Sequence, residues 1–291
     1  MILVTGATGF TGSHFMKKLM ETDKEIRCFV RPTSDTNRLD RNRIETVSGT
    51  LEDKDSYRKA LQGVDTLINI ASLGFGHADT IVNEAVNAGV RRAIFVSTTA
   101  IFTTLAAQTK AIRLAAESKV TGSSLDYTIL RPTMIYGTER DRNMSKLIRV
   151  LHRYPVMPIA GDGQSLQQPI YVDDLADAIM GCMSNPECSG KAYNLSGKEP
   201  LTFDQVIDIT ANALNKKVKK LHVPLRLILP VVGLYNRVAK NPKIKIEQVL
   251  RLNENKSFDH AAAKKDFGFS PISFAEGIKL EVERIRKLKL I

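Results

Sequence analysis

Short apolar runs alternate with amphipathic segments over the first half of the chain. The runs are apolar almost throughout, and the segments between them carry apolar residues at helical spacing. Strands of this kind are buried on both faces, as in a parallel sheet whose crossover helices cover both sides. The predicted strands are 1–4, 25–30, 44–49, 65–71, 92–97 and 126–131, and the predicted helices are 11–21, 53–61, 77–88 and 105–120.

The alternation ends near Arg131, and the rest of the chain is richer in turns and amphipathic segments. One later strand-like run, 191–197, is predicted to return to the sheet. We therefore expect an α/β fold, a doubly wound parallel sheet with helices on both faces and a smaller, mostly helical C-terminal lobe. The predicted sheet domain spans 1–155, with 171–197 returning to it, and the predicted smaller lobe spans 156–291. Helical spacing in this part marks 202–214, 246–252 and 272–289.

The longest apolar stretch is residues 221–239, LHVPLRLILPVVGLYNRVA. Two prolines and two arginines interrupt it, so a continuous membrane-spanning helix is not expected. We interpret the stretch as helices packed on a core or a cleft, with a membrane-surface role as the lesser alternative.

Composition narrows the class of protein. The 291 residues are 43% hydrophobic and 25% charged, which is ordinary for a globular chain with a sizeable core. The three cysteines form neither a CxxC pair nor an even disulfide framework, which favours a reducing compartment, and we expect a cytoplasmic protein. The opening MILVTG has no charged leader and no long apolar run, so no signal or transit peptide is expected.

The formal net charge is +11, and the basic residues fall in separate clusters at 38–43, 216–220 and 284–290. Nucleic-acid-binding domains usually combine a basic surface with a recognisable motif, and the sequence shows no such motif. We interpret the clusters as solvated surface and expect no nucleic-acid partner. The five histidines form no ligand motif, so no metal site is expected.

Three glycines at a three-residue spacing follow the first apolar run, in Thr5–Gly12, TGATGFTG. A strand, a glycine-rich turn and a helix together aim backbone N–H groups and the positive end of a helix at a diphosphate. Gly6 would permit the tight turn, Gly9 would let the backbone approach the diphosphate, and Gly12 would let the helix lie close to the strand. The sequence therefore predicts a dinucleotide site at this turn.

Further motifs extend this prediction along the chain, from GATGFTG (6–12) through 49–61, FVSTTAIF (95–102) and TILRPTMIYG (128–137) to 167–179, YNLSG (193–197) and 266–278. With these motifs the chain resembles the atypical and extended short-chain dehydrogenases/reductases, the NAD-dependent epimerase/dehydratase family. Within that family it looks nearest to members similar to an accessory subunit of complex I. The resemblance implies a Rossmann fold and a nicotinamide cofactor.

The residue that ends the second strand distinguishes the two nicotinamide cofactors. An acid there accepts a hydrogen bond from the ribose 2′-OH, whereas an arginine accommodates a 2′-phosphate. Arg31 occupies this position, so NADP is our first choice and NAD the second. The family usually has Asp near the adenine, and Thr50 stands there, so we expect the Leu51 backbone to hold the adenine. The predicted cofactor-binding residues are Gly6, Thr8, Gly9, Phe10, Thr11, Gly12, Arg31, Leu51, Ala71, Arg113, Pro132 and Thr133.

The resemblance implies a Tyr-x-x-x-Lys pair with a Ser or Thr hydroxyl, because hydride transfer needs a matched proton transfer. Thr98 matches the hydroxyl, and the tyrosine is missing. If Lys110 is the lysine, Ala106 stands at the tyrosine position. If Glu117 sets the register as the acid of the K-x-x-x-E pattern, Arg113 replaces the lysine and Thr109 the tyrosine. Both registers stay open.

His77 follows the fourth strand near a helix start and is a candidate proton carrier, because an imidazole titrates near neutral pH. The predicted catalytic residues are therefore Thr98, Lys110 and His77. Tyr136 is a second phenol, but it lies too far along the chain to replace the missing one.

Two glutamines, Gln167 and Gln168, stand where sugar-nucleotide enzymes of the family carry an arginine for the substrate diphosphate. This departure argues against a sugar nucleotide as substrate. Asp173 and Asp174 follow, and we expect them to cap and charge the first turn of a helix rather than to act in catalysis.

The sequence thus predicts an NAD(P)-binding oxidoreductase or epimerase-like protein, a monomer or homodimer, acting on a small carbonyl or hydroxyl compound. The alternative is a non-catalytic protein that holds NAD(P) as a sensor or as an accessory subunit of a larger assembly.

Overall fold

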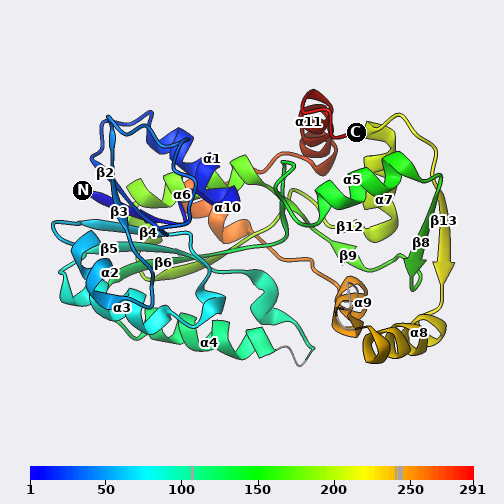
Figure 1. The fold of residues 1–291 in the computed structure, drawn as a ribbon, viewed down its shortest axis with the longest axis horizontal. Helices are drawn as coiled ribbons and strands as arrows, with labels where there is room; N and C mark the ends of the chain where they lie inside the picture. The colour runs from blue at the N-terminus through cyan, green and yellow to red at the C-terminus, as the bar shows by residue number, and fades with distance from the viewer. Residues whose placement is uncertain (106–107, 240, 242–244) are drawn as a thin grey trace.

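A parallel sheet of seven strands forms the centre of the structure, a computed structural model that describes residues 1–291 except 106–107, 240 and 242–244 (Figure 1). The strand order is β11-β6-β5-β4-β1-β2-β3, and the pairs are all parallel. The strands are β1 (Ile2–Thr5), β2 (Ile26–Val30), β3 (Ile44–Ser48), β4 (Thr66–Asn69), β5 (Arg92–Val96), β6 (Asp126–Pro132) and β11 (Lys191–Leu195). The predicted doubly wound sheet is confirmed, including the return of the late strand to its edge.

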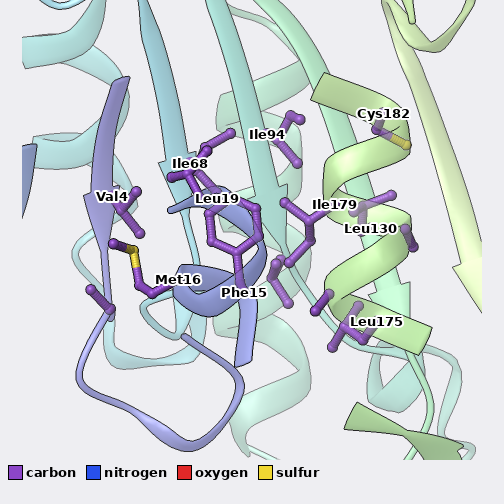
Figure 2. Close-up of a cluster of buried hydrophobic side chains, with 14 of the residues drawn as sticks. Val4, Phe15, Met16, Leu19, Ile68, Ile94, Leu130, Leu175, Ile179 and Cys182 are labelled. Carbon is purple, nitrogen blue, oxygen red and sulfur yellow. The ribbon is translucent and has the colours of Figure 1, made fainter. Parts of the chain in front are cut away.

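Helices cover both faces of this sheet because successive strand residues point to opposite sides. Val4, Ile68, Ile94 and Leu130 face one layer of helices, which Figure 2 shows with Phe15, Met16 and Leu19 of one helix and Leu175 and Ile179 of another. Leu3, Leu67, Phe95 and Ile129 face the other layer. The first layer consists of α1 (Phe10–Leu19), α6 (Val172–Ser184) and α10 (Ala261–Phe267), and the second of α2 (Lys54–Ala60), α3 (Ala78–Asn87) and α4 (Gln108–Thr121).

The smaller lobe has a core of its own, in which the apolar sides of three helices meet. Those helices are α5 (Met144–Arg153), α7 (Phe203–Ala213) and α11 (Phe274–Lys287). Short strand pairs complete the lobe: β7 (Ile135–Tyr136) with β10 (Ile170–Tyr171), β9 (Leu166–Gln167) with β12 (Leu201–Thr202), and β8 (Val156–Ala160) with β13 (Lys219–Val223). The described helices of this lobe also include α8 (Leu225–Val238) and α9 (Ile246–Leu252).

The prediction that 221–239 packs on a core or a cleft as helices is wrong. Its first residues belong to strand β13, Pro224 precedes the helix, and no residue of α8 is buried. Helix α9 covers only part of the apolar surface of α8, so the remaining apolar side chains face solvent. No helix in the described parts of the chain is long and apolar enough to cross a membrane.

The buried carboxyl group of Glu281 joins helix α11 to the backbone just after strand β7. Glu281 of α11 accepts a hydrogen bond from the backbone N–H of Gly137 at 3.1 Å, and its side chain is fully buried. Burial, followed by the hydrogen bond and charge of Asp141, raises the pKa of Glu281 from 4.5 to about 10. The proton is therefore retained in the folded state at neutral pH.

This shift makes stability depend on pH. Because the pKa of Glu281 is raised in the folded state, its protonated form stabilises the folded protein fully below pH 4.5. This contribution to the free energy of unfolding is lost as the pH rises towards about 10. We expect Glu281→Gln, which cannot ionise, to flatten the fall of Tm across the neutral and alkaline range. Thermal denaturation against pH measures this, and Glu283→Gln, an exposed residue of the same helix, is the control. Parallel curves for wild type and Glu281→Gln would show that the carboxyl is not held protonated.

Candidate functional site

The glycine turn lies between β1 and α1, where the backbone is too close to its neighbours for side chains. Gly6 has φ of +75°, and a Cβ there would lie 2.8 Å from the amide nitrogen of Ala71. A Cβ on Gly12 would overlap the carbonyl oxygen of Gly6. Two of the three glycines are therefore required by the closeness of strand, turn and helix, as the spacing predicted.

The first turn of α1 is open for an anion. Gly9 is its N-cap and offers no side chain to the free N–H groups of Phe10, Thr11 and Gly12, which have no partner within the helix. These groups and the helix dipole favour a negative charge at this end. A dinucleotide diphosphate fits such a site, because the uncapped N–H groups can donate to its oxygens and Gly9 at the N-cap carries no side chain.

The turn is held from both sides. Thr5 donates from its hydroxyl to Asn69 Oδ1 at 2.8 Å, which ties β1 to β4. Arg140, from the segment after β7, donates from Nη2 to the carbonyl of Thr8 at 2.9 Å. The turn thus joins the sheet to the smaller lobe, a contact for which the sequence gives no motif.

The end of β2 carries the residue expected to select the cofactor. Arg31 directly follows Val30, is exposed, and forms no ion pair with any residue described. The backbone N–H of Gly49 donates to the Val30 carbonyl, so the segment after β3 runs beside this strand end. Leu51 is half-buried there. Arg38 of the following loop and Thr8 of the glycine turn line a common hollow, so a second cation lies near the turn.

A cavity of about 170 Å³ lies at the carboxyl edge of β4 and β5. Thr11 borders it from α1, Thr98 from the end of β5 and Arg113 from α4. Carboxyl edges of doubly wound sheets are where such folds bind ligands. The lining is Thr11, Ile70, Ser72, Leu73, Gly74, Val96, Ser97, Thr98, Arg113 and Ile135.

The two neighbouring hydroxyls of this cavity differ in what they can offer. Ser97 donates its proton to Glu117 Oε1 at 2.5 Å. Thr98 Oγ1 instead accepts a hydrogen bond from the backbone N–H of Ala100 at 3.2 Å, which leaves its own proton for a ligand. Thr98 is therefore the hydroxyl that can donate to an oxygen in the cavity.

Arg113 supplies a positive charge that pairs with no carboxylate of the residues the structure describes. Its nearby acid, Glu117, is buried and accepts from Arg131 through two nitrogens at 2.6–3.1 Å. Arg113 itself bonds only weakly to Thr109 Oγ1, at 3.4 Å. Burial, and then the charge of Arg251, lowers the pKa of Arg113, so both the lack of solvent and a second cation disfavour its charge. An anionic group in the cavity would relieve both penalties.

Lys110 lies elsewhere. Its Nζ donates to the carbonyl of Thr103 at 2.6 Å, and Lys110 is not among the residues that line the cavity. Ala106, the tyrosine position that goes with Lys110, is outside the described residues. The register set by Glu117 is therefore the one in which a cation and the Thr98 hydroxyl border the same space.

The two remaining candidates for proton transfer do not line this cavity either. His77 Nε2 lies 3.3 Å from Glu52 Oε1, at the loop that follows β3. Tyr136 is buried between Tyr171 and Phe274 in the core of the smaller lobe. Its position agrees with the expectation that it lies too far along the chain.

The end of β6 meets the segment of the two glutamines. The hydroxyl of Thr133 donates to the Gln168 carbonyl at 2.5 Å, and the carbonyl of Pro132 accepts from Thr99 at 3.3 Å. Gln168 in turn donates from Nε2 to the carbonyl of Gly197 at 2.8 Å. These contacts build the wall between the sheet edge and the smaller lobe.

Two residues of that wall escaped the sequence analysis. Glu254, which follows α9, accepts from the hydroxyls of Thr103 and Thr104 at 2.7 and 2.9 Å. Lys256 donates to Gln167 Oε1 at 3.3 Å, and burial lowers its pKa to about 8. The segment Asn253–Lys256 has no motif, and its partners lie far away in the sequence, so only the folded chain brings them together.

The two acids after the glutamines lie in the first turn of α6 but do not cap it, and burial raises the pKa of Asp174 to about 7. Asp173 lies 2.6 Å from His14 Nδ1 of α1, and Asp174 accepts from the backbone N–H of Ile272. The N-cap is Tyr171, which makes no side-chain cap. The predicted cap is therefore wrong: Asp173 contacts helix α1, and Asp174 contacts the segment that precedes α11.

Comparison with known families gives one match over much of the chain. A family described as NAD(P)H-binding matches residues 6–186, more than half of the 291 residues. The match includes the glycine turn and the strand ends that border the cavity.

Individual proteins agree with this match. NADH dehydrogenase (ubiquinone) 1 alpha subcomplex subunit 9, mitochondrial, of Dictyostelium discoideum is 27% identical over 270 residues, which covers 84% of this chain and 73% of that protein. The 2-alkyl-3-oxoalkanoate reductase of Shewanella oneidensis is 24% identical and covers 95% of this chain and 84% of the reductase. The crystal structure of UDP-glucuronic acid 4-epimerase from Bacillus cereus in complex with NAD has a TM-score of 0.78 at 18% identity, with 99% of both chains covered. The resemblance to the atypical short-chain dehydrogenases and epimerases is confirmed.

The close packing of the turn generates a prediction. Gly12→Ala places a Cβ on the Gly6 carbonyl, so the helix must move away from the strand. We expect a lower Tm and loss of the thermal stabilisation by NADPH, both measurable by differential scanning fluorimetry.

The matched control is Gly233→Ala in α8, where a Cβ would meet Ile246 at an ordinary 3.7 Å. Replacing a helix-interior glycine by alanine there stabilises by up to about 1 kcal/mol. A Gly12→Ala protein that binds NADPH like wild type would contradict the structural role of Gly12.

Proposed function

The chain belongs to the NAD(P)H-binding family, and from that premise we propose that it uses NADP(H) to reduce a small carbonyl compound, or in reverse to oxidise the alcohol. The observation that carries the proposal is the cavity where the free proton of Thr98 and the unneutralised charge of Arg113 border one space at the carboxyl edge of the sheet. When bound, the nicotinamide supplies a hydride.

Cofactor binding is assigned to the residues around the turn and the strand ends. The first-turn N–H groups of α1 hold the diphosphate, Arg31 takes the 2′-phosphate, and Leu51 lies against the adenine. NAD, the alternative cofactor, has no 2′-phosphate and so would make no use of the charge of Arg31. The full proposed set is Gly6, Thr8, Gly9, Phe10, Thr11, Gly12, Arg31, Leu51, Ala71, Arg113, Pro132 and Thr133.

The proposed chemistry does without a phenol. Thr98 would donate a hydrogen bond to the substrate oxygen, and Arg113 would stabilise the negative charge on that oxygen. The nicotinamide would supply the hydride and solvent water the proton that together turn the carbonyl into an alcohol. Electrostatic stabilisation of the alkoxide thus replaces a dedicated acid at the tyrosine position, which Thr109 occupies in the register set by Glu117. Lys110 is assigned to holding the Thr103 carbonyl, and proton transfer by His77 stays a prediction that its contact with Glu52 does not support.

A second function is favoured by a different observation. The relative from Dictyostelium is named as a subunit of NADH dehydrogenase, and the family's tyrosine is missing here. A chain that holds NADP(H) without turnover, as an accessory subunit of an assembly, accounts for both.

The cytoplasmic location and the monomeric or homodimeric state are proposed as well.

Cofactor choice is tested at Arg31. We expect Arg31→Ala to weaken NADPH binding about tenfold or more, because a charge-assisted hydrogen bond contributes about 1.5–3 kcal/mol, and to leave NADH binding nearly unchanged. Fluorescence titration measures both affinities. Arg41→Ala, a change of the same charge at an exposed position in the following loop, is the control. Equal losses for both cofactors would remove Arg31 as the reader of the 2′-phosphate.

Turnover is tested with NADPH and a panel of ketones and 3-oxo acids, the latter suggested by the name of the Shewanella relative. We expect Thr98→Val to lower kcat about 10²–10³-fold, the usual cost of losing one donor to a developing oxyanion, with NADPH affinity unchanged. Lys110→Gln is the control and should retain activity. Turnover that survives Thr98→Val but not Lys110→Gln would reverse the two assignments, and NADPH binding without turnover of any compound would favour the accessory function.

A further inference from the structure

One face of α8 carries an apolar stripe that no described residue covers. The stripe consists of Leu227, Val231, Leu234 and Val238, whose exposed fractions are 58%, 68%, 64% and 77%. Spacings of four, three and four residues put these side chains on one side of a helix. Folded chains rarely leave several large aliphatic side chains together in water, so the stripe indicates a contact surface.

The opposite face of α8 is already occupied. Gly233 faces α9, where its Cβ position lies 3.7 Å from Ile246 Cδ1. The inward residues Leu225, Ile228 and Val232 are partly covered, whereas the stripe is open. In Figure 1, α8 runs along the outer edge of the smaller lobe, with α9 beside it. The stripe therefore points away from the body of the protein.

The charged residues of α8 are both basic, and the sequence on either side of the helix is rich in lysine. Between 216 and 245 the sequence contains nine basic residues and no acidic residue; the basic ones are Lys216, Lys217, Lys219, Lys220, Arg226, Arg237, Lys240, Lys243 and Lys245. Arg226 and Arg237 are both exposed on α8, about a quarter turn from the stripe. Neither forms an ion pair with a residue that the structure describes, whereas Lys220 is paired with Asp208.

This combination selects one partner. A second copy of the chain, docked through the same face, would bring the arginines of two α8 helices together, and α8 itself has no acid to pair them. A lipid surface rich in anionic headgroups instead accepts aliphatic side chains between its acyl chains and cations at its phosphates. Arginines a quarter turn from an apolar stripe are placed to reach that phosphate level.

We propose that α8 is a docking helix for anionic membrane surfaces, lying in the plane of the headgroups with Leu227, Val231, Leu234 and Val238 inserted and Arg226 and Arg237 at the phosphates. The proposal concerns a surface distinct from the cavity and does not depend on turnover there.

The sequence contains no tryptophan, so the fluorescence of a single introduced tryptophan can be measured without background from other indole groups. In Leu234→Trp, indole emission reports α8 alone. With vesicles of phosphatidylcholine and phosphatidylserine we expect a blue shift of the emission and quenching by brominated acyl chains. Pure phosphatidylcholine should give a weaker response, and added salt should weaken binding to the anionic vesicles. Leu280→Trp, an exposed position on α11, is the control and should show neither change.

Binding by the unlabelled chain is measured by vesicle flotation. We expect Val231→Gln with Leu234→Gln to lower the bound fraction at least about tenfold. Arg226→Glu with Arg237→Glu should remove the preference for phosphatidylserine. Leu280→Gln on α11 with Leu288→Gln at the C-cap of that helix is the matched control and should bind like wild type. Because all these positions are exposed, Tm and the NADPH response should be unchanged in each variant.

Three results would overturn the proposal. One is a wild-type chain that fails to float with anionic vesicles. Another is equal loss of binding in the α8 and α11 variants. The third is a wild-type dimer that becomes a monomer in Val231→Gln with Leu234→Gln while lipid binding is absent, which would assign the stripe to a second copy.

Discussion

The packing of α1 against the end of β1 is the constraint on which the rest of the site depends. Gly12 lies so close to the carbonyl of Gly6 that no side chain fits there. Gly9 is the N-cap of α1 and provides no side-chain cap. Strand, turn and helix can therefore lie close enough for the first-turn N–H groups to face outward together. Because these groups have no partner in the helix, the same packing that closes the fold creates a place for a diphosphate.

The position of the turn orders the rest of the carboxyl edge. Parallel strands end on one side of the sheet, so Arg31, Leu51, Ala71 and Thr98 follow their strands at the same edge. The smaller lobe is tied to that edge through Arg140 on the Thr8 carbonyl and through Glu254 on Thr103 and Thr104. A cavity bounded by a free hydroxyl proton and an unneutralised arginine results between them. This cavity could serve hydride chemistry without a phenol, or it could hold a cofactor in an assembly.

Much of this arrangement can be predicted from the sequence, and the parts that cannot share a physical reason. Continuous apolar runs predict buried parallel strands, and the glycine spacing predicts the turn, because both are local patterns. The choice between Lys110 and Arg113 depends on which side chain reaches the cavity, and Glu254 acts on threonines 150 residues away. Apolar content alone predicts that 221–239 packs on a core, because it does not tell whether another element of the fold covers these side chains. In α8, that neighbour covers only one face.

The central claim is that the first-turn N–H groups of α1 bind the diphosphate of a dinucleotide. Isothermal calorimetry of the purified chain with NADPH, NADP⁺ and the mononucleotide adenosine 2′,5′-bisphosphate tests it most directly. This mononucleotide keeps the adenine and the 2′-phosphate proposed for Leu51 and Arg31, and it lacks the diphosphate bridge. The account predicts measurable binding of both dinucleotides and much weaker binding of the mononucleotide. Equal binding of all three, or no heat and no thermal protection from either dinucleotide, would contradict it.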